Sequence, residues 1–194
     1  MAAALEDAGV RVERSARPDL SLAEAAQVGH GLIGSATTLS LDEARFTRLS
    51  AAADASGAPT ANRIMGGRHR DWLAADRRRT ELRACWADFF TRYDVLICPV
   101  TRLAAFPHLQ DRNVASRTLQ IGGDPQPYLS MIGWTAAVGA AYLPVTVPPV
   151  GSTADGLPVG IQIVAPYLED RTSLHVGREL AGVLGGYRVP PMAR

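Results

Sequence analysis

Serine hydroxyls beside glycines are the first side chains in this sequence that could do chemistry, because a serine held on a strained turn can act as a nucleophile. Such a turn has the pattern Gly-x-Ser-x-Gly, and this pattern does not occur in the chain. Ser35 and Ser152 each follow a glycine, and we interpret both as loop or cap residues. His30-Gly31 is only faintly similar to an oxyanion loop and is better explained as part of a helix.

The histidines and cysteines have no spacing that indicates a metal or redox site. His69, His108 and His175 form no His-Glu-x-x-His pattern, and Cys85 and Cys98 form no Cys-x-x-Cys. We therefore expect no metal and no cofactor. The cysteines are predicted to be reduced thiols, of which one or both are buried.

The basic residues are all arginine. Lysine and arginine together number 20, against 19 acidic residues, and no lysine occurs in the chain. This excludes a P-loop lysine, a Schiff-base lysine and a Ser–Lys nucleophile pair within these residues. A formal charge of +1 is also too small for a typical nucleic-acid binder, so no nucleic-acid partner is expected.

The composition is that of a globular chain. Its 194 residues are 47% hydrophobic and 20% charged, which excludes intrinsic disorder and is sufficient for a core in one domain. The sequence has no apolar run of about 18 residues and does not begin like a signal peptide. It therefore predicts no membrane association and a cytoplasmic location.

The first residues predict a helix, a turn and a strand. Residues 1–8 have the character of the last two turns of a helix, which Gly9 would end, and Val10–Glu13 alternates like a short strand. Two helical turns alone are marginal in water. This opening therefore suggests that the sequence is part of something larger.

Capping patterns predict the next helices. Ser21–Glu24 is a capping box that would open a helix to about Gly34, and Ser40–Glu43 is a second box for a helix to about Ala53. Ser56–Pro59 breaks the pattern. The longest helix is expected from about Gly67 to Arg92, with an apolar face formed by Leu82, Trp86, Phe89 and Tyr93.

Six arginines cluster on that long helix. A basic patch for an acidic partner is one interpretation, but Asp76 and Glu81 lie three and four residues from Arg79 and Arg77. We favour a solvated face with internal ion pairs. The arginines are Arg68, Arg70, Arg77, Arg78, Arg79 and Arg83.

The second half of the chain alternates apolar runs and turns. Tyr93–Cys98 has the character of a buried strand, and residues 101–127 that of a long loop. A helix is expected over residues 128–138, and strands over 144–148 and 159–164 on either side of an Asp-Gly turn. Asp170 is expected to cap the final helix, which Gly185-Gly186 would end.

Two stretches resemble the amidase signature family. Tyr93-Asp-Val-Leu-Ile-Cys-Pro99 is similar to the strand that follows an aromatic-ended helix in that family. Leu143-Pro-Val-Thr-Val-Pro148, followed by Asp155-Gly-Leu-Pro-Val-Gly-Ile-Gln-Ile-Val164 and a helix opening at Glu169-Asp170, resembles its C-terminal region. The motifs stand in the family's order and separation. The resemblance covers essentially the whole chain and is weakest over residues 14–66.

The resemblance implies a C-terminal portion only. The family hydrolyses amides with a Ser-cisSer-Lys triad and a glycine- and serine-rich oxyanion loop, all in its N-terminal portion. Because this chain has no lysine, no catalytic residue is carried over. Residues 1–194 are then a single C-terminal segment of an amidase domain, which we expect to be inactive alone. The alternative is a non-catalytic module that binds a small ligand or a partner.

The resemblance also suggests side chains that line a substrate pocket, because the family's C-terminal portion supplies part of the wall around the acyl pocket. Cys98, Pro99 and Thr101 stand at the end of a buried strand, and Trp134 and Thr135 stand beside the long loop. Plain core packing remains the alternative for all five.

Two positions depart from the family's pattern. Where the family often has a run like Asn-Leu-x-Gly-Leu-Pro, this chain has Gly139 in place of asparagine and Tyr142 in place of glycine. Because glycine often marks a positive φ or a close approach, Tyr142 puts the local backbone in question and could reshape the pocket.

The expected fold is α/β, with a mixed β-sheet covered by helices. The sheet would contain Val10–Glu13, Asp94–Cys98, Val145–Val147 and Val159–Val164, of which the second and last are apolar enough for neighbours on both sides. Expected partners are a small amide substrate of the whole enzyme and either a second copy or an N-terminal amidase portion. A charged residue at Ile161 or Ile163, whichever is exposed, should then improve solubility.

Overall fold

A computed structural model describes residues 1–55, 61–111 and 114–189, so the predicted break at Ser56–Pro59 lies outside the described residues. The chain divides into two compact units. The helical unit comprises Pro18–Phe89 and Gly133–Leu143. The sheet unit comprises Met1–Arg17, Phe90–Ile132 and Pro144–Arg194. Both units are therefore assembled from segments that are distant in the sequence.

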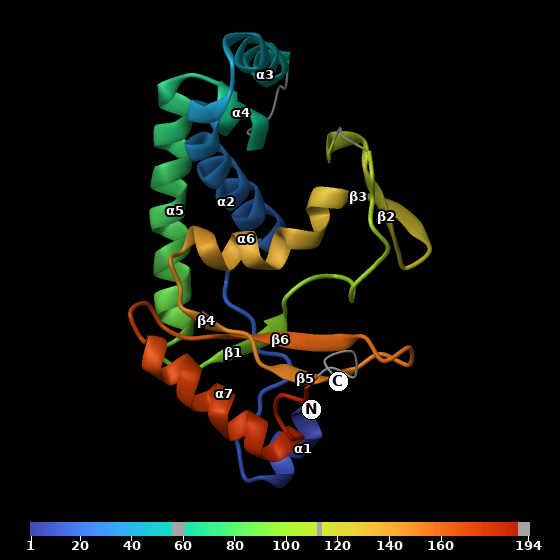
Figure 1. Ribbon diagram of the computed structural model, residues 1–194. Coiled ribbons are helices and arrows are strands. Elements are labelled where there is room, and N and C mark those ends of the chain that lie inside the picture. The colour runs from blue at the N-terminus through green and yellow to red at the C-terminus, as the bar shows by residue number, and fades with distance from the viewer. Residues whose placement is uncertain (56–60, 112–113, 190–194) are drawn as a thin grey trace. The chain divides into compact units, whose positions relative to one another are not determined.

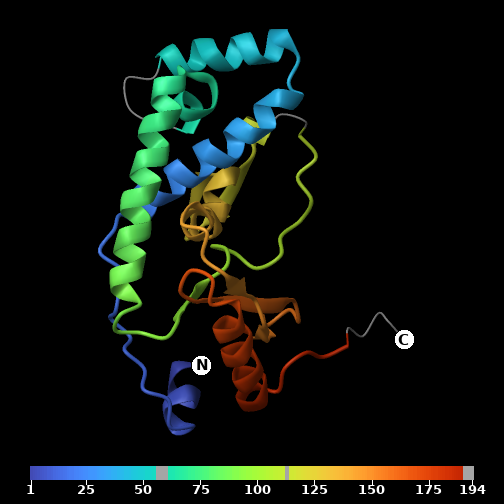
Figure 2. The ribbon, with the colours of Figure 1, turned by 90° about the vertical axis from the view of Figure 1, so that its left-hand side faces the viewer.

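The helical unit contains five α-helices among its described residues (Figure 1). They are α2 (Leu22–Thr37), α3 (Glu43–Ala55), α4 (Ala61–Gly66), α5 (His69–Phe89) and α6 (Gly133–Ala140), with a short 3-10 turn, η1 (Thr38–Ser40), after α2. In Figure 2, the long α5 lies beside α2 and α4, with which it makes contacts. The expected helices are confirmed, although the helix predicted over residues 128–138 divides into a 3-10 turn and α6.

The serine half of the first predicted capping box is confirmed, whereas the Glu24 carboxylate pairs with Arg78 on α5. The Ser21 hydroxyl accepts a hydrogen bond from the Glu24 N–H at the start of α2. The second prediction is wrong, because η1 includes Ser40, whose hydroxyl donates to the Thr37 carbonyl. Asp42 caps α3 instead, since its Oδ1 accepts from the Arg45 N–H at 2.8 Å.

Close backbone packing organises the core of the helical unit. An added Cβ at Gly29 on α2 would lie 2.2 Å from the Ala136 carbonyl oxygen on α6, so only glycine permits this approach. Leu82, Trp86 and Phe89 form the predicted buried face of α5. Tyr93 lies beyond the end of α5, so the predicted helix is about one turn longer than the observed one.

The sheet unit is built around β6 (Pro158–Val164), which pairs with β1 (Leu96–Pro99), β4 (Val145–Thr146) and β5 (Pro149–Ser152). Figure 1 shows α7 (Asp170–Leu184) against this sheet, where it contacts β4, β5 and β6. The α/β class, with a sheet and helical cover, is confirmed. All pairings in this sheet are antiparallel over the described residues, so the expected mixture of directions is not observed there.

Val10–Glu13 forms no strand, contrary to prediction. The N-terminal helix α1 (Ala2–Asp7) continues into a closing turn in which Gly9 has a φ of +83° and the Val10 N–H donates to the Leu5 carbonyl. The Val10 amide is thus used by the helix end and is not available to a sheet. The predicted role of Gly9 is confirmed.

The predicted long loop contains a hairpin. β2 (Thr118–Ile121) and β3 (Asp124–Pro127) pair in antiparallel fashion across Gly122 and Gly123, which have φ values of +66° and +94°. A two-residue Gly-Gly turn suits the twist of such a hairpin. Two 3-10 turns, η2 (Val114–Ser116) and η3 (Tyr128–Ile132), flank it.

The core of the sheet unit lies between β6 and the helices α1 and α7, where Ile163, Leu5 and Leu180 are buried together. Ile161 is half-buried, so neither isoleucine is the exposed position that the sequence suggested. Large apolar side chains are exposed instead around the start of α7, at Leu168 and Leu174. Among the described residues, no helix combines the length and the apolar character needed to cross a membrane.

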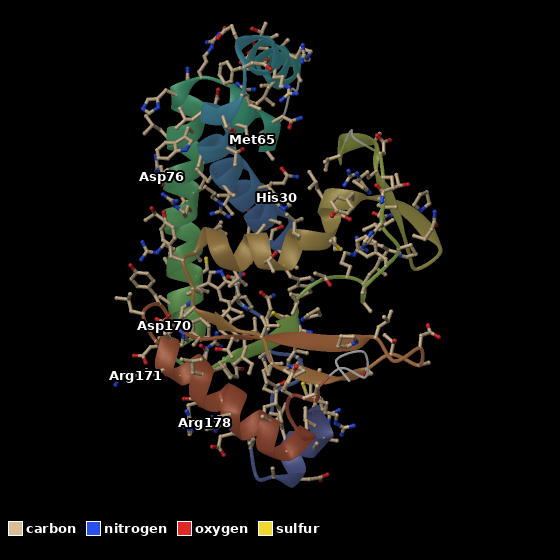
Figure 3. All side chains as sticks on the ribbon, in the orientation of Figure 1. His30, Met65, Asp76, Asp170, Arg171 and Arg178 are labelled. Carbon is tan, nitrogen blue, oxygen red and sulfur yellow. The ribbon has the colours of Figure 1, made fainter. Side chains whose placement is uncertain are left out.

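The start of α7 differs from prediction by one residue. Glu169 is the N-cap and Asp170 is the first helical residue, at the top of α7 in Figure 3. The Glu169 side chain caps no backbone amide and accepts a hydrogen bond from the Thr172 hydroxyl at 3.0 Å. The predicted end at Gly185 is confirmed by its left-handed φ of +89°.

Candidate functional site

The main candidate site is a hollow where β1 ends, which we call the β1 hollow. It has a volume of about 630 Å³ and lies within the sheet unit. The end of β1 and the loop that follows form one wall, and the first half of β6 forms another. The lining residues are Met1, residues 97–105, Val147 and residues 158–161.

Three of the five predicted pocket residues line the β1 hollow, namely Cys98, Pro99 and Thr101. Trp134 and Thr135 lie on α6 in the helical unit. The structure therefore brings together the three residues at the strand end. That any of the five contacts substrate stays a prediction.

The wall of the β1 hollow is mostly apolar. Arg102 contributes the single charged side chain among its described lining residues. Thr101 shapes the loop, because its hydroxyl donates to the Leu103 carbonyl at 2.6 Å and so turns the chain just beyond the strand. A hollow of this character can receive an uncharged aliphatic or aromatic group.

Gln162 stands directly behind this wall. It is 2% exposed, and its Cα pairs with that of Cys98 across the β1–β6 ladder. Its Nε2 donates to the Pro99 carbonyl at 2.8 Å and contacts the Cys98 sulfur at 3.6 Å. Sequence reasoning missed Gln162, although a polar residue in the otherwise apolar run Val159–Val164 was the available signal.

Cys98 is buried and reduced, as predicted, and Cys85 is also free but only half-buried. Burial raises the pKa of the Cys98 thiol to about 11, and the hydrogen bond from Gln162 opposes this shift. The thiol is therefore protonated near neutral pH, which does not suit a nucleophile. Cys98 therefore serves as a wall residue of the hollow.

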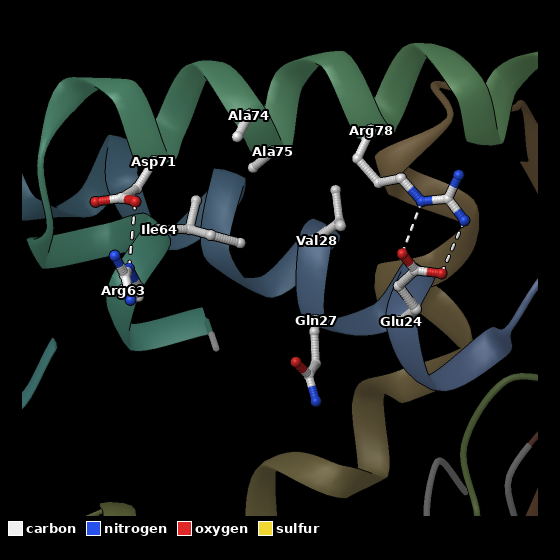
Figure 4. Close-up of a pocket in the computed structure, with 9 residues that line it drawn as sticks. All are labelled: Glu24, Gln27, Val28, Arg63, Ile64, Asp71, Ala74, Ala75 and Arg78. Atoms are coloured by element: carbon white, nitrogen blue, oxygen red, sulfur yellow. Dashed lines mark hydrogen bonds and ion pairs between the residues drawn. The ribbon is translucent and has the colours of Figure 1, made fainter. Parts of the chain in front are cut away.

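A second hollow, the helical groove, lies between α2, α4 and α5 (Figure 4) and has a volume of about 330 Å³. Val28, Ile64 and Ala75 form its apolar floor. Ion pairs bound it at both ends. Arg63 Nε lies 3.2 Å from Asp71, and Arg78 contacts both carboxylate oxygens of Glu24 at 2.7 and 2.8 Å.

The ion pairs of the helical groove support the predicted solvated face on α5. The hydrogen bonds from Arg78 lower the pKa of the Glu24 carboxyl, and Arg78 also contacts Glu81. Arg79 pairs with Asp76 and Arg77 with Glu81, at the predicted spacings. Because these charges are largely compensated within the unit, the β1 hollow is the better candidate site.

The remaining chemical candidates have structural surroundings. His30 lies within α2, as predicted, whereas Ser35 lies in the last turns of α2 and not in a loop. The Ser35 hydroxyl donates to the carbonyls of Gly31 and Ile64, which ties α2 to α4. Ser152 ends β5. Among the described residues, no cluster of three or more His, Cys, Asp or Glu side chains could hold a metal ion.

Comparison with known proteins is consistent with the resemblance. A family model described as Amidase matches residues 1–174. Over 57 residues, the chain is 52% identical to fatty-acid amide hydrolase 2-A of Danio rerio. This aligned stretch covers 29% of the chain and 11% of that protein. It is 35% identical over 122 residues to one component of the glutamyl-tRNA(Gln) amidotransferase of Anaeromyxobacter sp. (strain K), covering 62% of this chain and 23% of that component.

The fold is similar to that of solved structures. One was described as an unexpected vestigial protein complex that reveals the evolutionary origins of an s-triazine catabolic enzyme. It aligns with a TM-score of 0.66 and 23% identity over 97% of this chain and 39% of its own. The chain thus spans less than a quarter of these two curated relatives and about two fifths of this solved chain.

Proposed function

The chain belongs to the Amidase family, and on that premise we propose that it forms the C-terminal part of an enzyme that hydrolyses carbon–nitrogen amide bonds. The observation that carries the proposal is the absence of lysine from a chain that matches this family over most of its length. A Ser-cisSer-Lys triad needs a lysine as the base for its bridging serine. The catalytic residues must then come from a portion outside these 194 residues.

In this proposal, the β1 hollow receives an apolar group of the amide substrate. Cys98, Pro99 and Thr101 form its wall, and the apolar lining favours an uncharged aliphatic or aromatic group. Contact of Trp134 and Thr135 with substrate is proposed separately, since both residues lie on α6 in the helical unit. Binding an apolar group here orients the substrate, while the chemistry is performed by residues elsewhere.

The proposed partner is the remaining portion of an amidase, and in its absence a second copy of this chain. Leu168 and Leu174 are 74% and 58% exposed, which leaves apolar surface for association. A cytoplasmic location stays a prediction.

The test is an activity assay on the purified chain, freed of contaminating hydrolases. We expect no turnover of simple amides or esters, and activity only when the N-terminal portion of a related amidase is co-expressed. Turnover by the chain alone that disappears when one of its own serines is replaced by alanine would overturn the proposal. Light scattering reports association, and a chain that stays monomeric at high concentration contradicts the proposed self-association.

The rival function is a non-catalytic binding module. The β1 hollow also supports this function, because a hollow can bind a ligand without catalytic residues in its wall. Reading the DNA upstream of this chain distinguishes the two. Triad residues encoded in frame immediately before it favour the enzyme, and a start codon with no amidase-like coding sequence before it favours the module.

A further inference from the structure

Gln162 and Ser173 are the two buried polar residues found among the described part of the chain. Ser173 accepts from the Thr146 hydroxyl and donates to the Asp170 carbonyl, so it joins α7 to β4. Gln162 uses its amide differently, because both contacts of its Nε2 are with the end of β1. A buried carboxamide is costly unless it is hydrogen-bonded, so its placement calls for an explanation beyond packing.

We propose that Gln162 is a positioning residue for the wall of the β1 hollow, which holds the Pro99 carbonyl and thereby sets where Pro99 and Thr101 stand against a bound amide. This inference rests on the proposed function of the hollow. The geometry supports it, because Pro99 is the last residue of β1 and lies in the wall, which continues into the loop that follows.

The hydrogen bonds of the sheet show what the Gln162 side chain adds at this point. The Ile161 N–H donates to the Pro148 carbonyl, on the side of β6 that faces away from β1. Ile161 is the ladder partner of Pro99, so it donates no hydrogen bond to β1 there, and proline has no N–H to donate in return. Pro99 and Ile161 therefore form one of the non-hydrogen-bonded pairs that alternate along an antiparallel ladder, and the Gln162 side chain adds a direct link from β6 to the Pro99 carbonyl.

Cys98 provides a reporter at the wall of the same hollow. Cys98 is a lining residue and its sulfur contacts the Gln162 amide, so we expect a molecule bound in the hollow to slow reaction of the thiol. The probe is benzamide, a small apolar amide that suits the lining. In a Cys85→Ala background, alkylation by iodoacetamide at alkaline pH reports the reactivity of the Cys98 thiol alone. Titration with benzamide then measures how strongly the bound amide protects this thiol from alkylation.

The decisive variant is Gln162→Met, which has a similar length but no donor. We expect benzamide to protect Cys98 in the parent chain and the half-protecting concentration to rise at least tenfold in the variant. The matched control is Ser173→Ala, which removes another buried hydrogen bond of the same unit away from β1. It should lower the unfolding midpoint to a comparable degree and leave the protection unchanged.

The outcomes separate this inference from the proposed function. Equal protection in the parent chain and in Gln162→Met overturns the positioning role and leaves the amide-binding hollow intact. No protection in the parent chain overturns both, since no amide then occupies the hollow. If Ser173→Ala loses as much protection as Gln162→Met, the positioning role is also overturned, because a general loosening of the sheet unit then explains the loss. If Gln162→Met does not fold, Gln162→Asn, whose amide is too short to reach Pro99, is expected to show the same loss.

Discussion

The guanidinium of Arg79 on α5 lies 4.7 Å from the centre of the Tyr142 ring, and that of Arg83 lies 5.5 Å from the same ring. Tyr142 follows α6 in the helical unit and has a φ of +60°, a left-handed conformation that glycine adopts far more readily. The tyrosine that replaces a family glycine therefore has a strained backbone and gains two cation–π contacts.

The Tyr142 ring and its backbone strain have opposite effects on stability, which two substitutions separate. Tyr142→Ala loses the ring but keeps the strain, whereas Tyr142→Gly loses the ring and relieves the strain. We expect Tyr142→Ala to be less stable than the parent by about 1–2 kcal/mol, because two exposed cation–π contacts of about 0.5–1 kcal/mol each are lost. Tyr142→Gly should lie close to the parent, because removing a left-handed non-glycine residue returns roughly 1–2 kcal/mol. Urea unfolding measures the order, and an alanine variant as stable as the glycine variant contradicts it.

The close approach of α2 and α6 predicts a strong effect at Gly29. Gly29→Ala would place a Cβ 2.2 Å from the Ala136 carbonyl oxygen, so the helices must separate, at a cost on the order of 1–3 kcal/mol or more. Gly139→Ala on α6 is the matched control, because its Cβ meets nothing within 4 Å. This control should raise stability by about 1 kcal/mol through helix propensity. Thermal unfolding of both variants tests the pair, and equal effects would refute the close approach.

His30 predicts a pH dependence of stability. Its Nε2 is buried without a hydrogen-bond partner in the described structure, and burial lowers the pKa of the imidazole below its usual value of 6.5. Between the folded-state pKa and 6.5, the unfolded chain binds a proton that the folded chain does not. The free energy of unfolding must therefore fall as the pH falls through that window.

The His30→Gln variant removes this titration and leaves every other group in place. The difference in unfolding free energy between parent and variant should stay constant above about pH 7 and shift in favour of the variant as the pH is lowered below that value. Urea titrations at several pH values measure this difference. A difference that does not change with pH shows that His30 is not desolvated in the folded chain.

The start of α7 predicts that Glu169, and not Asp170, occupies the capping position. Asp170→Ala then loses only the favourable interaction of a carboxylate with the helix dipole, about 0.3–1 kcal/mol. Glu169→Ser introduces a side chain that can cap, and should stabilise the chain by about 0.5–1 kcal/mol. If Asp170→Ala costs more and Glu169→Ser has no effect, Asp170 is the cap after all. Chemical unfolding of the two variants separates these results.

Several elements could be predicted because their signals are local. The Ser21 hydroxyl reaches an amide three residues away, and Gly185 ends α7 within one turn of it. The hairpin β2–β3 was missed although its turn is also local, because Pro125 and Pro127 made its second strand look like a loop. A Gly-Gly pair between two four-residue segments was the signal that could have found it.

The candidate site was predicted only in part. Cys98, Pro99 and Thr101 were identified because a buried strand ends there, and strand ends are where crevices form. Gln162 was not identified, because its role depends on the antiparallel register that places it opposite Cys98. That register joins residues 64 positions apart, and no local pattern specifies it.

The sequence alone determined the family, the absence of a lysine base and most of the helices and strands, since these depend on residue identity and on contacts within a few positions. Only the tertiary structure decided the strand directions, the division into two units and the surroundings of the β1 hollow. Val10–Glu13 alternates like a strand, yet the closing turn of α1 uses the Val10 amide. The physical reason is that a backbone N–H donates to one partner at a time. Where the local sequence suits both a helix end and a strand, packing against residues distant in the sequence decides which partner it takes.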